Sequence, residues 1–345
     1  GGASMRSDQG RLPLHRVCVR GDRPIVALLC ERGARVDEPD YTGWMPVALA
    51  AKHGHTAIVE DLLQYPDARA VVDAASRNGQ TAMHLACFHG HADALAVLLR
   101  MGAAPNVGTS VMLTQPLHFA CMRGHARCAR LLLEHGVKAD VGMANRSTPL
   151  MLSCLHHRVE CATLLLEHAA DPDATNTTQC TALHISAMEG DDECVRLLLS
   201  RRASVDIANV DGHTALHVAC IRARPSCAQL LVDARAAVHR VDLKGITPLH
   251  CAAAKGSLAA TTLLLQRGAP LARDGVGLTP IDVAASSDVA QACRTARARR
   301  RWRCAFLWIA LVAHLRHVAA ARTYAPGGTG YEECKRRRLA AGMRP

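Results

Sequence analysis

Short apolar blocks alternate with short polar blocks along most of this chain, in a fixed order. In "TALHISAMEGDDECVRLLLSRRASVD" an apolar block begins at Thr181, a polar "GDD" follows, and a second apolar run begins at Cys194. Each block has the length of a short helix, so the pattern predicts two antiparallel helices joined by a tight turn. Threonine can cap the first helix through its hydroxyl, and Pro149 or Pro248 fits the first helical turn elsewhere in the chain.

This two-helix pattern recurs at a nearly constant interval. The phrase "TALH" occurs at Thr181 and again at Thr214, 33 residues later. Aligning the chain with itself gives nine equivalent pairs of adjacent residues, such as Leu14-His15 and Leu183-His184. From one repeat to the next, the second residue of the pair advances by 33, 36, 34, 33, 33, 33, 33 and 32 positions. These second residues are His15, Ala48, His84, His118, Met151, His184, His217, His250 and Asp282. Such short helix pairs cannot bury their apolar faces alone, so neighbouring units must stack around one continuous core.

The repeated phrases resemble those of ankyrin repeats. "DGHTALHVA", "KGITPLHCA" and "GLTPIDVA" carry the resemblance, together with "VRLLLSRRASVD" and "ARLLLEHGVKAD", over about residues 10–294. The resemblance implies an all-α solenoid of about nine helix-turn-helix units with hairpin-like turns. The second helix of a unit can end at a glycine, such as Gly102, Gly136 or Gly268. Asp282 in place of histidine, followed by a shortened second helix in "SSDVAQACR", is similar to a closing repeat.

Composition and charge agree with a helical array and separate it from its tail. Hydrophobic residues are 49% of the chain and aromatic residues only 3%, which favours close packing of helices. The net charge of +11 arises within residues 294–345, where thirteen Arg or Lys stand against Glu332 and Glu333. The repeats are therefore neutral overall. Residues 1–9 are expected to be an extension without secretory features, and the missing initiator Met indicates a fragment or a processed form.

The aligned histidines have a structural interpretation rather than a chemical one. In the ankyrin family this histidine bonds the turn of the repeat, and a neutral imidazole can both donate and accept. The histidines of the "GH" turns, His55, His91 and His125, receive the same interpretation. We find no HExxH, GxSxG, Walker A or GxGxxG motif. The repeats are therefore interpreted as non-enzymatic, with no catalytic residue, cofactor or metal.

The fifteen cysteines also follow the repeat. Most stand three or ten residues after the aligned position, where they act as small core residues in a reducing compartment. Equivalent positions of neighbouring repeats are expected roughly 8–10 Å apart, beyond the reach of a disulfide. Within one repeat, Cys121 and Cys128, Cys154 and Cys161, or Cys220 and Cys227 could approach each other. No CxxC pair is present to indicate zinc.

The position of a residue within its repeat, counted from the aligned residue, predicts a partner-binding surface. In ankyrin-like proteins, positions four and five after the aligned residue and the tips of the turns line the recognition face. Met, Trp, Tyr and Arg, which are enriched at interface hot spots, occur there. The alternative is that the apolar row only packs between helices. The predicted contact residues are Tyr41, Trp44, His53, Arg77, Asn78, Phe88, His89, Val111, Met112, Met122, Arg123, Leu155, His156, Met188, Ile221 and Arg222.

The C-terminal segment is expected to form a basic, amphipathic helix over residues 295–322 and a disordered tail over 323–345. Its apolar core is too short for a transmembrane helix. Three interpretations stay open: a helix that caps the last repeat, a calmodulin target or anionic membrane-surface helix, and a nuclear-import or nonspecific nucleic-acid contact. The candidate interaction residues of this tail are Arg299, Arg300, Arg301, Trp302, Phe306 and Ile309.

The sequence thus predicts a non-enzymatic scaffold or adaptor, monomeric and either cytoplasmic or nuclear. It would bind a protein segment with apolar anchors and acidic flanks across repeats two to five. Two alternatives stay open. The chain could be the substrate receptor of a ubiquitin ligase, although residues 302–320 show no clear docking box, or it could be the regulatory module of a larger protein.

Overall fold

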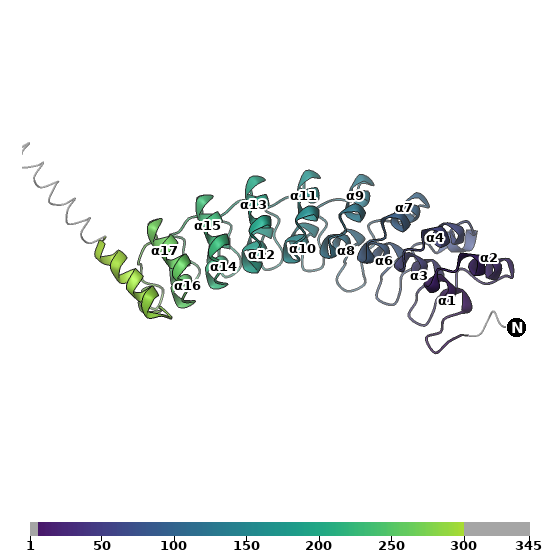
Figure 1. The fold of residues 1–345 in the computed structure, drawn as a ribbon, viewed down its shortest axis with the longest axis horizontal. Helices are drawn as coiled ribbons and strands as arrows, with labels where there is room; N and C mark the ends of the chain where they lie inside the picture. The colour runs from purple at the N-terminus through teal and green to yellow at the C-terminus, as the bar shows by residue number, and fades with distance from the viewer. Residues whose placement is uncertain (1–5, 300–345) are drawn as a thin grey trace, which may run out of the picture.

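The computed structural model describes residues 6–299, in which all regular secondary structure is helical. Helix pairs follow one another along a gently curved, elongated body (Figure 1). The first helices are α1 (Pro13–Arg20), α3 (Pro46–Lys52), α6 (Ala82–His89), α8 (Pro116–Arg123), α10 (Pro149–Leu155), α12 (Ala182–Glu189), α14 (Ala215–Ile221) and α16 (Pro248–Ala254). The second helices are α2 (Arg23–Glu31), α4 (Thr56–Leu62), α7 (Ala92–Arg100), α9 (Ala126–Glu134), α11 (Val159–Glu167), α13 (Asp192–Ser200), α15 (Pro225–Asp233) and α17 (Leu258–Gln266).

The helix boundaries have the local causes that the sequence predicts. The hydroxyl of Thr148 accepts a hydrogen bond from the backbone N–H of Met151 at 3.3 Å, and Thr181 and Thr247 cap α12 and α16 in the same way. After the second helices, Gly102, Gly136 and Gly268 have φ values of 88°, 81° and 83°. This left-handed conformation strains any residue with a Cβ atom, so glycine ends these helices at little cost.

One hydrophobic core runs through the whole stack. First helices pack against first helices and second helices against second helices, and one cluster of buried residues extends from Leu14 to Ala269. Each repeat from two to eight places a leucine at the same position of its second helix, almost fully buried. These residues are Leu62, Leu98, Leu132, Leu165, Leu198, Leu231 and Leu264. The expected continuous interior is therefore confirmed.

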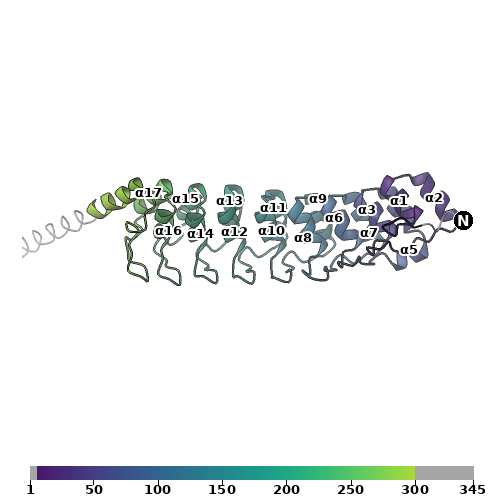
Figure 2. The same cartoon turned by 90° about the horizontal axis from the view of Figure 1, so that it is seen from below.

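The loops between repeats project from one side of the helix stack (Figure 2). Each loop donates one backbone hydrogen bond to the loop before it. For example, the N–H of Arg77 donates to the carbonyl of Thr42 at 3.1 Å, and the N–H of Ser110 donates to that of Asn78 at 3.2 Å. Because a first helix begins at a loop and ends at the turn into its second helix, the helix-joining turns lie along the opposite edge.

Two regions depart from the regular repeat. The 36-residue spacing between repeats two and three accommodates an additional short helix, α5 (Pro66–Ala70). In the ninth unit residues 280–283 form turns in place of a first helix, whereas residues 287–299 are helical and bury Val289 and Cys293.

The expected shortening of the second helix in the ninth unit was therefore wrong. Asp282 accepts hydrogen bonds from the N–H and the hydroxyl of Thr279, at 2.8 Å and 2.7 Å, which closes a local turn instead of supporting a helix. The helix that follows is rich in Ala and Arg, which are strong helix formers. It continues through the expected boundary between residues 294 and 295.

Candidate protein-interaction surface

The aligned histidines join neighbouring repeats. The backbone N–H of Thr81 donates to Nδ1 of His84 at 2.9 Å, and Nε2 of His84 lies 3.0 Å from the carbonyl oxygen of Thr114 in the next loop. These partners define a neutral imidazole with its proton on Nε2. The same bond to the next loop is made by His15 to Trp44, His184 to His213, His217 to Ile246 and His250 to Leu278, at 3.0–3.1 Å. The structural role predicted for these histidines is confirmed.

We call the aligned histidines, with their bonds to the next loop, the histidine ladder. His118 is its exception. Its Nδ1 accepts from the N–H of Gln115 at 3.2 Å, but its buried Nε2, which faces the backbone of Ser147 in the next loop, makes no well-aligned hydrogen bond with any described residue. Burial lowers the pKa of His118 to about 4, and it lowers the pKa of the bonded His217 to about 4 as well. The neutral imidazole is thus the form that the fold stabilises, because burial penalises the charged ring.

A second set of side chains closes the turns along the opposite edge. We call His55, His91, His125 and Arg158 the capping row. Nε2 of His55 lies 3.2 Å from the carbonyl of Val19, and Nε2 of His125 lies 3.2 Å from that of Phe88. Each member of the row lies over a glycine of the preceding repeat. A Cβ atom at Gly90, for example, would lie 2.5 Å from the ring of His125. The structural interpretation of the "GH" histidines therefore also holds.

Beside the capping row lies an exposed set of basic residues, one per repeat, which we call the outward row. Its members are His53, His89, Arg123 and His156, at the ends of the first helices of repeats two to five. Arg222 is exposed at the same position of repeat seven. The predicted apolar residues one position earlier are half-buried: Phe88, Met122, Leu155, Met188 and Ile221. These apolar side chains thus pack against the stack and keep one side open to solvent.

An aromatic cluster lies at the boundary of repeats three and four. The rings of Phe88 and Phe119 meet edge to face with centroids 5.7 Å apart, and the guanidinium of Arg123 lies 4.7 Å from the centroid of Phe88. The ring of His89 is 5.0 Å from that of Phe88. A cation over a half-buried aromatic ring is a stable arrangement that still offers an apolar edge and a charge to a ligand.

The predicted loop residues differ in exposure. Tyr41, Arg77 and Asn78 are exposed, whereas Trp44 is half-buried. Three consecutive exposed apolar residues form the tip of the loop between repeats three and four, and Val111 and Met112 belong to the predicted set. There Val111 is 81% exposed, Met112 42% and Leu113 53%, and Leu113 has a positive φ of 52°. The expected apolar tip is therefore present.

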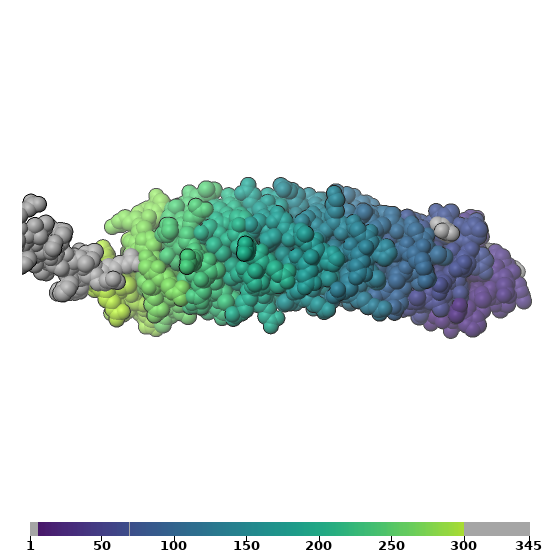
Figure 3. Space-filling model, turned by 90° about the horizontal axis from the view of Figure 1, so that it is seen from above, coloured from purple at the N-terminus to yellow at the C-terminus, as the bar shows by residue number. Residues whose placement is uncertain are grey.

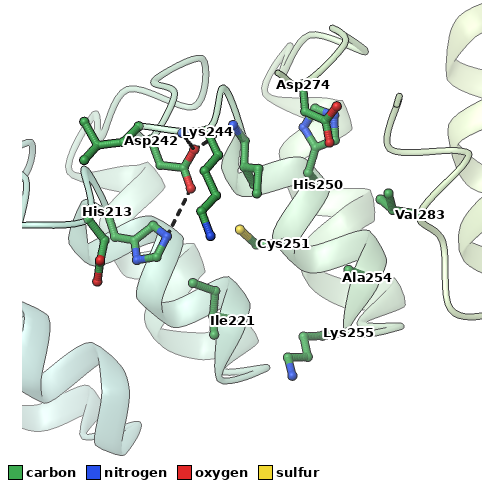
Figure 4. Close-up of a pocket in the computed structure, with 13 residues that line it drawn as sticks. His213, Ile221, Asp242, Lys244, His250, Cys251, Ala254, Lys255, Asp274 and Val283 are labelled. Carbon is green, nitrogen blue, oxygen red and sulfur yellow. Dashed lines mark hydrogen bonds and ion pairs between the residues drawn. The ribbon is translucent and has the colours of Figure 1, made fainter. Parts of the chain in front are cut away.

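A cleft of about 520 Å³ lies between the loops and first helices of repeats seven to nine (Figure 4). Ile221, Cys251 and Ala254 form its apolar side, and Lys244 extends into it from a loop. The buried carboxylate of Asp242 is occupied by its own loop: it accepts from the N–H groups of Lys244 and Ile246 at 2.8 Å each, and its other oxygen lies 3.2 Å from His213.

Sequence reasoning centred the site on repeats two to five. It named Ile221 as a contact residue but did not predict the cleft that Ile221 lines. The signal was present, because Ala254 stands where Phe88, Met122 and Ile221 fill the equivalent position. A small residue at the end of a first helix leaves space that a larger one would occupy.

The cysteines in the described part of the chain are free thiols. Their contacts differ from the expected ones, because a thiol of a first helix meets a thiol of the second helix in the next repeat. The contacts join Cys87 with Cys128, Cys121 with Cys161 and Cys154 with Cys194. Side chains of a first helix point toward the following repeat, which the spacing of equivalent positions did not reveal. Burial raises the pKa of Cys87 and Cys121, so these thiols stay protonated.

Of the tail residues, Arg299 is exposed on the helix of residues 287–299. The others, Arg300, Arg301, Trp302, Phe306 and Ile309, lie outside the described residues. Over residues 6–299 no group of three or more His, Cys, Asp or Glu side chains is arranged to hold a metal ion. Within the same range, no helix has both the length and the apolar character that crossing a membrane requires.

Stacked helix pairs, a histidine ladder and an exposed row of variable side chains define a repeat solenoid that presents a binding surface. The family model for ankyrin repeats in three copies matches residues 14–109, 108–176 and 170–242, and the single ankyrin-repeat model matches residues 244–275. The chain therefore belongs to the ankyrin-repeat family. Ankyrin-repeat domains are generally non-catalytic interaction modules, and this solenoid is a protein-interaction scaffold.

The curated relatives match only part of the repeat array. The chain is 31% identical over 96 residues to ankyrin repeat and SOCS box protein 2 of Bos taurus, which covers 28% of this chain and 15% of that protein. It is 36% identical over 88 residues to the E3 ubiquitin-protein ligase XBAT33 of Arabidopsis thaliana, covering 25% and 17%. The matches thus span less than a fifth of each relative.

Solved structures of two ankyrin domains are similar over a longer stretch. The ankyrin repeat domain of human ASB11 has a TM-score of 0.59 and 30% identity, and the match covers 65% of this chain and 98% of that one. The ankyrin repeat domain of Bcl-3 has a TM-score of 0.57 and 28% identity, covering 63% and 100%. Both support an ankyrin solenoid.

Proposed function

We propose that this protein is a non-enzymatic scaffold or adaptor that binds a segment of another protein along repeats two to five. The contact surface consists of the outward row, the half-buried apolar residues beside it and the loop tips, including Tyr41, Arg77 and Asn78. The single observation that carries this proposal is the apolar tip formed by Val111, Met112 and Leu113.

This tip is unfavourable in the isolated chain. Val111 exposes 81% of its surface, and Leu113 adopts a left-handed backbone conformation that ordinarily belongs to glycine. The exposed apolar surface is costly without a partner, whereas the left-handed backbone recurs at Arg146 and Gln179 in the next two loops and is a feature of the repeat. Burial against a partner would offset the cost of the exposed surface, at roughly 25 cal/mol for each Å² of apolar surface removed from water.

Protein capture with matched variants tests this proposal. We expect the triple variant Phe88→Asp, Met122→Asp and Val111→Asp to lose the proteins retained by the wild-type chain in affinity purification, as measured by quantitative mass spectrometry. Val111→Asp alone should weaken retention. Val276→Asp is the matched control, because Val276 is also a loop residue with 81% exposure. Equal retention by Val111→Asp and Val276→Asp, with unchanged circular dichroism, would contradict the assigned surface.

A second candidate function is that of a substrate receptor in a ubiquitin ligase. It is favoured by the names of the relatives, which include a SOCS box protein and an E3 ubiquitin-protein ligase. Co-purification of elongin or cullin components with the full chain, and their loss when residues 294–345 are deleted, would support this role. Retention of neither component would leave the scaffold function as the proposal.

The basic segment after the repeats is proposed as a separate contact region. Arg297 and Arg299 are exposed and begin its basic run. Clustered arginines attract calmodulin, anionic membranes or, nonspecifically, nucleic acid. Measuring the binding of calmodulin, anionic vesicles and nucleic acid to the full chain and to a chain lacking residues 294–345 tests this region.

The proposed monomeric state and intracellular location are checked by light scattering and by imaging of a tagged chain.

A further inference from the structure

The helix-joining turns of repeats two to five contain basic side chains and no carboxylate. Repeat two has "HGH" at His53, repeat three has "HGH" at His89, repeat four has "RGH" at Arg123 and repeat five has "HHR" at His156. Repeat six ends the series with "EGD" at Glu189. Nine His or Arg side chains therefore follow one another along a single edge of the solenoid, interrupted within these turns only by glycine.

Contacts within each turn and between successive turns order this edge. Within repeat two the rings of His53 and His55 stack with centroids 6.2 Å apart, and within repeat three those of His89 and His91 do the same at 6.2 Å. Because the capping row seats each turn on the turn before it, the outward row is held at the spacing of the repeats. The members of the row therefore recur at a regular interval along the edge.

Three members of the outward row are histidines, which gain positive charge as the solution becomes more acidic. The pKa of His53, His89 and His156 is lowered, first by partial burial and then by neighbouring cations. The charged groups that shift the pKa of His53 are Lys52, His55, His91 and Arg11. Those that shift the pKa of His89 are Lys52, His91, His53 and Arg123. Those that shift the pKa of His156 are Arg158, His157, Arg123 and Glu189.

Carboxylates do little to offset these cations. Glu189 is the one carboxylate among the groups that act on the three histidines. Asp191 of the next turn lies 3.0 Å from His157, outside the outward row. On the second helices behind the edge, Asp93 is paired with Arg127 at 2.7 Å, and Glu160 lies in the first turn of α11. An anion that approaches the outward row therefore meets side chains which gain positive charge as the solution becomes more acidic.

We propose that the outward row, with Phe88, Met122 and Leu155 beside it, binds an extended acidic segment of a partner protein, and that acidification strengthens this binding. The inference deepens the proposed function and rests on it. Carboxylates of the segment would pair with the row, and apolar side chains between them would cover the half-buried residues. An acidic protein is favoured over nucleic acid because the basic residues of repeats three to five each have an apolar neighbour.

The spacing of the row predicts the spacing of the acidic residues. Adjacent packed helices lie roughly 8–10 Å apart. A polyproline-like extended chain advances about 3.1 Å per residue, or roughly 9 Å in three residues, and it presents every third side chain on the same side. A carboxylate at every third position can therefore meet each of the four members of the outward row in turn.

The test uses the full chain and a fluorescent peptide of about twelve residues, with glutamate at every third position and leucine before each glutamate. Fluorescence anisotropy gives its dissociation constant at about pH 7.5 and at about pH 6.0, at one ionic strength. Glutamate, with an ordinary pKa of about 4.3, stays ionised at both values. The carboxylates raise the histidine pKa values, so protons are taken up on binding and affinity increases as the pH falls. We expect roughly fivefold tighter binding at the lower pH, from three exposed ion pairs.

Matched variants assign the effect to the outward row. The variant His53→Gln, His89→Gln and His156→Gln should lose the pH dependence. The control variant changes three exposed histidines outside this edge, His135, His168 and His239, to glutamine and should keep it. Circular dichroism at both pH values verifies that each protein is folded. A peptide with glutamine in place of glutamate should bind at least several-fold more weakly.

Each result has a definite consequence. Equal binding of the glutamate and glutamine peptides, absence of binding, or a pH dependence that persists in the outward-row variant would overturn this inference. A single-stranded oligothymidylate that binds as tightly, with the same pH dependence, would show that the partner class is wrong. None of these results touches the proposed function, which fails instead if Val111→Asp retains every captured protein.

Discussion

Repeats two to five and repeats seven to nine share one backbone design and present different surfaces. The first region has an uninterrupted edge of His and Arg, whereas exposed apolar loop residues occur in both, at Val111 in the first and at Leu243 and Val276 in the second. The second has a cleft of about 520 Å³, in which Lys244 and Lys255 lie among Asp211, Asp242 and Asp274. The two regions are parts of the same elongated body (Figure 3). Their comparison shows that the repeated positions set stability, whereas the positions between them set what the surface can bind.

Acid should destabilise both regions through the same histidine ladder, and this is the largest expected effect. The folded pKa of His118 and of His217 is about 4, below the ordinary value of 6.5. The unfolded chain therefore binds more protons, and stability is lost as the pH falls from about 6.5 to about 4. The loss should reach about 3 kcal/mol for each of these histidines. Urea denaturation across this pH range measures it, and a constant midpoint would contradict it.

Removing one core leucine should cost the two regions the same amount. Leu132 and Leu231 occupy equivalent positions in repeats four and seven, and both are fully buried. Leu132→Ala and Leu231→Ala should each lower the free energy of unfolding by about 3 kcal/mol, because each leaves a cavity in the shared core. Urea denaturation followed by circular dichroism measures both. Costs that differ by more than about twofold would mean that the regions do not share one kind of interior.

The turns, by contrast, should respond differently to the same substitution. Gly90 and Gly256 both have a positive φ, of 82° and 69°. A Cβ atom at Gly90 would meet the His125 ring at 2.5 Å, whereas at Gly256 its nearest neighbour would be Ala285 at 3.6 Å. Gly256→Ala should cost about 1 kcal/mol for the backbone alone, and Gly90→Ala about twice that. Thermal unfolding of the two variants checks the order, and a larger effect at Gly256 would refute it.

Exposed ion pairs should matter least in either region. Arg127 pairs with Asp93 at 2.7 Å, and Arg267 pairs with Asp233 at 2.7 Å. Both pairs are exposed, so solvent and salt screen them. Arg127→Ala and Arg267→Ala should leave the urea midpoint of unfolding unchanged within error. A clear shift in one of them alone would reveal an electrostatic difference between the regions.

Much of the fold could be predicted because the repeat carries its own signals. Thr181 as a cap and Gly102 in a left-handed turn follow from local chemistry, and the role of His184 follows from its recurrence. The ninth unit was harder, since its helix of residues 287–299 depends on how Val289 and Cys293 pack against the last repeat. Contacts between thiols were missed for the same reason, because they depend on the tilt of side chains between units.

The candidate surface could be predicted only in part. Position within the repeat identified the outward row and the apolar tip, but the half-burial of Phe88 depends on Phe119 and Arg123, which close around it. The cleft arises from a missing volume at Ala254, and an absent side chain leaves little trace in a pattern of hydrophobic and polar residues.

The histidine ladder also bears on how such a chain can change its length. Every bond of the ladder joins residues 28 to 30 positions apart, so no bond reaches beyond the adjacent unit. Duplicating or deleting one 33-residue segment in frame would restore each severed bond with an equivalent donor and acceptor. Gene duplication can therefore lengthen the array and diversify its surface one module at a time, without redesign of the remainder.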